Sequence, residues 1–151
     1  MSAVPRRRSR AWAAACARSR ICERAPKEIL AALPTAKIGG FGKSPKPLDL
    51  SRAPDPERLA KAMRYAQLMV HSKPFAVAAF FSAKLNESID ETANALRTYG
   101  EDLLRELRAG QPETRANMDA HWALLLELCT LVLGEEETDL LRRRARVPAS
   151  A

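Results

Sequence analysis

The side chains that could do chemistry in this chain are few and stand apart from one another. Its two histidines, His71 and His121, have no second histidine or cysteine three or four positions away, so neither forms a metal-binding pair on one helix face. The three cysteines, Cys16, Cys22 and Cys129, include no CxxC pair, and their odd number favours a reducing compartment over a disulfide framework. We predict no catalytic residue, no metal site and no cofactor.

An apolar stretch over residues 120–133, AHWALLLELCTLVL, carries two further polar candidates. A buried carboxylate needs a partner, so Glu127 is expected to pair with an arginine from another helix, for a structural purpose. We expect His121 to be a core residue and Cys129 to fill space as a small apolar side chain. At 14 residues the stretch is shorter than the roughly 20 that a membrane span needs, so no span is predicted.

Two short motifs lie in the Pro- and Gly-rich residues 34–56. The run Gly39-Gly40-Phe41-Gly42-Lys43-Ser44 ends like a phosphate-binding loop, but Lys37 stands where that loop needs glycine, and Pro45 and Pro47 disfavour the required helix. We therefore expect a linker here. Residues 47–51, PLDLS, resemble the PxDLS peptide by which many regulators dock on CtBP corepressors. The resemblance implies an accessible docking peptide; the alternative is a linker leading into a helix.

The net charge of +7 is unevenly distributed. Residues 1–50 carry 11 Lys and Arg against three acids, whereas residues 51–151 carry 14 against 15. Attraction to nucleic acid or anionic lipid should therefore follow the N-terminal part. We nominate its arginines for contact with nucleic acid or another anionic partner: Arg6, Arg7, Arg8, Arg10, Arg18 and Arg20.

The first 25 residues leave three interpretations open. Six arginines precede the first acid, Glu23, among Ala and Ser, which is typical of a mitochondrial presequence cleaved near residue 25. The same residues could be a disordered basic tail, or a nucleic-acid or nuclear-import segment. Cytoplasmic localisation is the primary prediction, with mitochondrial or nuclear localisation if the source is eukaryotic.

The elements that must position these residues are predicted to be helices, since Ala and Leu dominate and aromatic residues are only 5% of the sequence. Asp55 and Pro56 are start signals for a helix that ends near His71. A second helix is expected from about residue 74 to Ala109, continuous or broken near Ser88 or Gly100, with Gly110 as its end. A third covers residues 116–133, and a final one ends near Arg146. A short helix over residues 26–33 could precede them.

These elements predict an all-α fold, a small antiparallel bundle of three to four helices over residues 55–147, preceded by a basic, largely disordered arm over residues 1–54. Five aromatic residues at helical spacing are expected to be core residues: Phe75, Phe80, Phe81, Tyr99 and Trp122. The helix over residues 116–133 should lie at the centre of the bundle. Because few other segments are apolar enough to surround it, a second copy of the chain could cover the rest through a helix–helix interface. The residues nominated for that interface are Trp122, Leu125, Leu128, Cys129 and Val132.

The sequence therefore favours a non-enzymatic interaction or adaptor protein, which associates with itself or with a partner protein and uses its basic arm for electrostatic contact. The first alternative is a nucleic-acid-associated regulator that binds through the arm. The second is a mitochondrial protein with a cleavable presequence.

Overall fold

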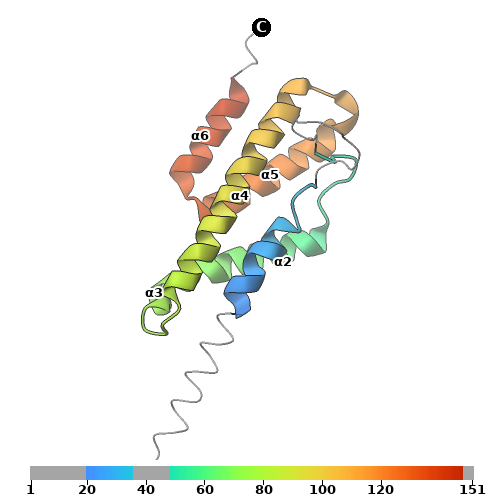
Figure 1. Ribbon diagram of the computed structural model, residues 1–151. Coiled ribbons are helices and arrows are strands. Elements are labelled where there is room, and N and C mark those ends of the chain that lie inside the picture. Colours follow the sequence, from blue (N-terminus) through green and yellow to red (C-terminus); the bar gives the residue numbers. More distant parts are fainter. Residues whose placement is uncertain (1–19, 36–47, 148–151) are drawn as a thin grey trace, which may run out of the picture.

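The computed structural model describes residues 20–35 and 48–147, and over these residues the fold is built from helices. A helix over residues 20–30 is followed by α2 (Pro56–His71), α3 (Lys73–Ala76), α4 (Ser82–Ala109), a short 3₁₀ helix (Pro112–Thr114), α5 (Arg115–Val132) and α6 (Glu135–Arg146) (Figure 1). The prediction of an all-α fold is confirmed. The prediction of three to four helices is wrong, because the described residues form six α-helices.

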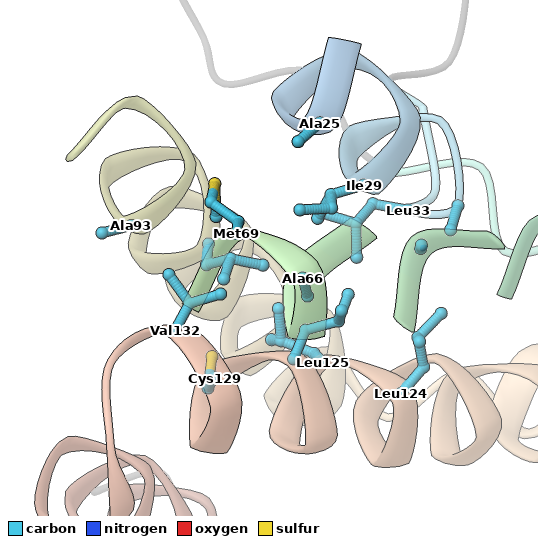
Figure 2. Close-up of a cluster of buried hydrophobic side chains, with 14 of the residues drawn as sticks. Ala25, Ile29, Leu33, Ala66, Met69, Ala93, Leu124, Leu125, Cys129 and Val132 are labelled. Carbon is cyan, nitrogen blue, oxygen red and sulfur yellow. The ribbon is translucent and has the colours of Figure 1, made fainter. Parts of the chain in front are cut away.

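Helix α5 lies at the centre of the fold, as its apolar sequence predicts. It contacts α2, α4 and α6, and its buried residues recur every three or four positions along one broad face. Figure 2 shows Leu125, Cys129 and Val132 of α5 among side chains from the helix over residues 20–30 and from α2. No helix in the described part of the chain has the length and hydrophobicity needed to cross a bilayer.

The helix over residues 20–30, which the sequence placed within a largely disordered arm, belongs to this core. Its Cys22, Ala25 and Ile29 are buried, and Ile29 points toward α5 and α2 (Figure 2). The buried residues Leu48 and Leu50 follow, and Asp49 N–H donates to the carbonyl oxygen of Thr35 at 2.7 Å. The arm contains apolar residues at helical spacing, and their burial outweighs its basic composition. Residues 1–19 and 36–47 lie outside the described residues.

The start of α2 matches the prediction in detail. Asp55 has extended backbone angles, and its Oδ1 accepts from the N–H of Glu57 at 2.9 Å. Pro56 fits the first turn because a helix leaves that N–H unpaired in any case. His71 ends the helix as expected.

The predicted helix from residue 74 to Ala109 is interrupted, but not at Ser88 or Gly100. The chain leaves helical geometry between Val77 and Phe81, and α4 then runs unbroken to Gly110, which ends it in the left-handed conformation with φ of 64°. Ser88 does not cap a helix; it is buried, and its hydroxyl donates to the Cys22 carbonyl oxygen. Gly100 is buried inside α4, where another helix approaches closely.

That helix is α6, which runs parallel to α4. Arg97 Nε and Nη2 donate to Glu137 at 3.0 and 2.7 Å, and Arg144 makes a similar two-pronged contact with Glu101. Between these two ion pairs, a Cβ atom on Gly100 would lie only 3.3 Å from Leu141 Cδ2. The missing side chain at Gly100 therefore lets α6 approach α4 closely, and the two exposed ion pairs hold it there. Few side chains of α6 itself are buried.

Candidate interaction surface

The buried histidine, His121, has a structural role. His121 is buried, and its Nε2 lies 2.9 Å from the carbonyl oxygen of Arg52, while its Nδ1 has no hydrogen-bond partner among the described residues. Asn117, one turn earlier, donates to the Leu50 carbonyl oxygen at 3.0 Å. Together these side chains fix residues 50–52 against α5. His71 lies exposed at the end of α2.

The described cysteines are poor nucleophiles. Cys22 and Cys129 are both buried and free of disulfides. Burial raises the pKa of the Cys22 thiol, and it raises the pKa of Cys129 to about 12. Because the thiolate is the reactive form, neither side chain is activated at neutral pH. Cys16 lies outside the described residues, and over residues 20–35 and 48–147 no group of His, Cys, Asp and Glu could hold a metal ion.

Two predictions about the apolar helix need correction. Glu127 is exposed rather than buried, so it requires no arginine partner. The nominated interface residues face their own chain: Leu125, Leu128, Cys129 and Val132 are buried and Trp122 is half-buried. The helix over residues 20–30 supplies the cover that a second copy was expected to provide, so the original reason for a homodimer no longer holds.

Of the nominated arginines, only Arg20 falls within the described residues, where it lies exposed at the first described position of its helix. Arg6, Arg7, Arg8, Arg10 and Arg18 lie outside the described residues, as does the whole phosphate-loop-like segment over residues 39–44. In the PLDLS motif, Leu48 and Leu50 are buried in the core. An extended docking peptide must offer such side chains to its partner, so the implied accessibility of this motif is wrong.

Six large apolar side chains of the described residues are exposed, and four of them lie at the α3 end of the molecule. Phe80 is 96% exposed, Val77 74% and Phe75 64%, and Leu68 on the last turns of α2 is also exposed. We call these four residues the α3 surface: Leu68, Phe75, Val77 and Phe80. Two of them correct the prediction that all five aromatic residues are core; only Phe81 is fully buried, and Tyr99 and Trp122 are half-buried.

The backbone at Phe80 explains how the ring comes to face solvent. The N–H of Phe81 bonds to the carbonyl oxygen of Ala76 at 3.0 Å, and that of Phe80 to Val77 at 3.2 Å, a Schellman motif that ends the helical turns. Such a motif needs a left-handed residue at the position of Phe80, where φ is 57°. Glycine usually takes this place, because a side chain there costs about 1–2 kcal/mol.

The motif also fixes which of the two adjacent rings is buried. Phe81 is 6% exposed and packs into the core beside the buried Ala76, which supplies the apolar contact that accompanies a Schellman motif. Phe80 then has to face away from the core. The strain at Phe80 is therefore maintained by the packing of Phe81, as expected for a backbone outlier that the surrounding structure determines.

A small apolar pocket lies next to the α3 surface and shares Leu68 with it. Its volume is about 140 Å³, and its lining residues are Ile21, Cys22, Ala25, Leu68, Met69 and Ser72. The pocket shows that the N-terminal end of the helix over residues 20–30 lies beside the C-terminal end of α2. Figure 1 shows both at the same end of the molecule as α3, away from the C-terminal end of α6.

Comparison of the chain with protein-family models, with curated proteins and with solved structures found no match.

Sequence reasoning missed the α3 surface, although one signal pointed to it. Residues 58–86 contain no Asp or Glu, yet they contain five Lys and Arg. An acid-free stretch of that length, with Phe75, Phe80 and Phe81 inside it, is unusual in a body whose net charge is close to zero. Helical spacing could not predict that Phe80 is exposed while Phe81 is buried, because this difference depends on the chain reversal between them.

Proposed function

We propose that this protein is a non-enzymatic interaction protein that docks on another macromolecule through the α3 surface, with its basic N-terminal residues adding electrostatic contact. The observation that carries the proposal is the fully exposed ring of Phe80 in a left-handed backbone position. Glycine at this position would relieve the backbone strain, and the fold would lose no buried apolar contact with the ring. Strained positions of this kind cluster at functional sites.

The neighbouring side chains support the same interpretation. Exposed apolar groups that lie within one short segment mark interaction sites more often than singly scattered ones do. Aromatic side chains are also the usual energetic anchors of interfaces. The proposal of a non-enzymatic role is supported by the chemical groups themselves, because His121 fixes a loop and both described cysteines have raised pKa values.

The proposal is tested by placing a photo-cross-linking phenylalanine analogue at position 80 of the full chain in its native cells. Leu140, an exposed leucine on α6, gives the matched control position. We expect a cross-linked adduct from position 80 that is absent from position 140 and is weakened by Phe75→Ser. Equal labelling from both positions, or none from position 80, would contradict the proposed function.

The nucleic-acid alternative remains a separate proposal, supported by the excess positive charge of residues 1–50. It expects binding to DNA or RNA that weakens steeply with salt and falls when Arg6 and Arg7 are changed to Gln. It also expects Phe80→Asn to leave that binding unchanged, which distinguishes it from docking through the α3 surface.

A further inference from the structure

We infer that the partner of the α3 surface is a second copy of this chain. In the resulting two-fold dimer, the Phe80 ring of each copy enters the apolar pocket beside the α3 surface of the other copy. This inference rests on the proposed function and names the partner of that same surface. Three features of the described residues carry it: the size of the pocket, the position of the ring and the charges around them.

The pocket has the size and lining that suit one aromatic ring. Its volume is about 140 Å³, and an apolar cavity of roughly 150 Å³ holds a benzene molecule. Buried side chains line its inner part and more exposed ones its mouth: Cys22, Ala25 and Met69 are buried, whereas Ile21 and Ser72 are half-buried and Leu68 is exposed. A phenylalanine ring that enters from solvent therefore meets an apolar floor.

Phe80 supplies such a ring at the same end of the molecule. Its side chain is 96% exposed, so it fills no pocket of its own chain. The last turns of α2 line the pocket, and α3 and the turn at Phe80 follow directly, at the end where the helix over residues 20–30 begins (Figure 1). Because ring and pocket lie at one end, a two-fold axis there lets both copies make the same contact at once. Such a contact closes the assembly as a dimer.

The charges around the α3 surface have both signs, as a self-associating surface requires. Arg64 on α2 and Lys73 on α3 are exposed cations, and Glu87 and Asp90 on the first turns of α4 are exposed acids. None of the four forms an ion pair within the described part of the chain. A partner surface of a single sign would place two of them against a like charge, which disfavours binding. In a two-fold dimer the cations of one copy can instead face the acids of the other.

The small area of the α3 surface indicates a reversible dimer. A stable protein–protein interface takes roughly 800 Å² from each partner, and four exposed side chains with one pocket supply less. In such an interface an aromatic ring that fills a pocket of the partner carries much of the binding energy. Dimerisation should therefore depend on concentration and on the ring of Phe80.

The inference is tested by analytical ultracentrifugation of the full-length chain over a range of concentrations. Phe80→Asn removes the ring, and Ile21→Trp narrows the pocket. Leu140→Asn and Leu140→Trp introduce the same residues at a distant exposed leucine on α6 and serve as matched controls. Circular dichroism melting of each variant reports whether it is folded. A photo-cross-linking phenylalanine analogue at position 80, in a mixture of isotope-labelled and unlabelled chains, identifies by mass spectrometry the residues that the ring touches in a second copy.

We expect the mass of the natural chain to rise from that of one chain toward that of two as its concentration increases. Phe80→Asn should raise the dissociation constant of the dimer at least about a hundredfold, because burial of each of the two rings contributes about tenfold or more. Ile21→Trp should have a similar effect, and the two Leu140 variants should dimerise like the natural chain. An equimolar mixture of Phe80→Asn and Ile21→Trp should dimerise more tightly than either variant alone, since one ring can still enter one open pocket. The cross-link should join the two isotopic forms at residues that line the pocket.

Three results would overturn the inference: the mass of one chain at every concentration up to the millimolar range, dimerisation of Phe80→Asn equal to that of the natural chain, or a mixture that dimerises no more tightly than its two variants. If the chain stays monomeric while position 80 cross-links in cells to a different macromolecule, the dimer inference fails and the proposed function stands. If the chain stays monomeric and position 80 gives no cross-link in cells, both fail.

Discussion

Ser88 on α4 completes the hydrogen bonding of Cys22, which lies 66 residues earlier in the chain. Its hydroxyl donates to the Cys22 carbonyl oxygen at 2.8 Å. In a regular helix that carbonyl would accept from the N–H four residues on, but residue 26 is a proline and has no N–H. The serine of one helix therefore replaces the hydrogen bond that a proline removes from another, and it fixes the helix over residues 20–30 against α4.

The first prediction concerns this replacement. Ser88→Ala should lower the free energy of unfolding by about 1–3 kcal/mol, because it leaves a buried carbonyl oxygen unpaired. In a Pro26→Ala background the new N–H of residue 26 can reach that oxygen, so the same change should cost less. Urea denaturation of the four chains measures the coupling. Equal costs in both backgrounds would show that Ser88 does not substitute for the missing N–H.

A second prediction tests whether the helix over residues 20–30 is part of the core. Ile29 is completely buried, so Ile29→Ala should lower the free energy of unfolding by about 2–5 kcal/mol. Ile21 on the same helix is only half-buried and gives the matched control, with a clearly smaller loss for Ile21→Ala. Comparable small losses at both positions would mean that this helix packs only loosely on the rest of the fold.

The third prediction follows from the ion pairs between α4 and α6. The hydrogen bonds from Arg144 and Arg97 lower the pKa of Glu101 and Glu137 below the ordinary value of 4.5. A carboxyl whose pKa is lower in the folded chain stabilises the fold above its unfolded pKa, and this contribution is lost as pH falls through the folded pKa. Acid should therefore weaken the docking of α6.

Urea midpoints at neutral pH and in acid measure this effect. At neutral pH, Glu101→Gln/Glu137→Gln should cost about 0.2–1 kcal/mol for each pair, since both pairs are largely exposed to solvent. In acid the difference from the natural chain should shrink, because the natural carboxyls are then protonated as well. A difference that stays constant from neutral pH to acid would rule out these ion pairs as its source.

How far the sequence predicts this fold depends on whether a signal is local. The Asp55–Pro56 start, the Gly110 end and the central position of α5 follow from capping chemistry and apolar composition, and all three are observed. A short helix was expected over residues 26–33, but its start at residue 20 and its burial in the core were missed because the basic composition suggested a solvated arm. Its burial depends on long-range partners such as Ser88, which no local pattern reveals.

The same distinction applies to the candidate surface. Helical spacing placed Phe81 correctly in the core but assigned Phe80 to it as well. The chain reversal that separates the two rings contains no glycine, so the sequence there has no residue that would predict a turn. Gly100 was expected to mark a weak point in α4, whereas it makes room for α6. In both cases the outcome was decided by packing between helices.

The central claim is that Phe80 is held exposed at a cost to stability, for contact with a partner. The free energy of unfolding of Phe80→Asn tests it most directly, with Phe81→Ala as the comparison. Asparagine tolerates a left-handed backbone, so the account predicts stability equal to that of the natural chain or higher by up to about 1 kcal/mol, while Phe81→Ala loses about 3–5 kcal/mol. A loss of several kcal/mol for Phe80→Asn would mean that this ring is packed, and would contradict the account.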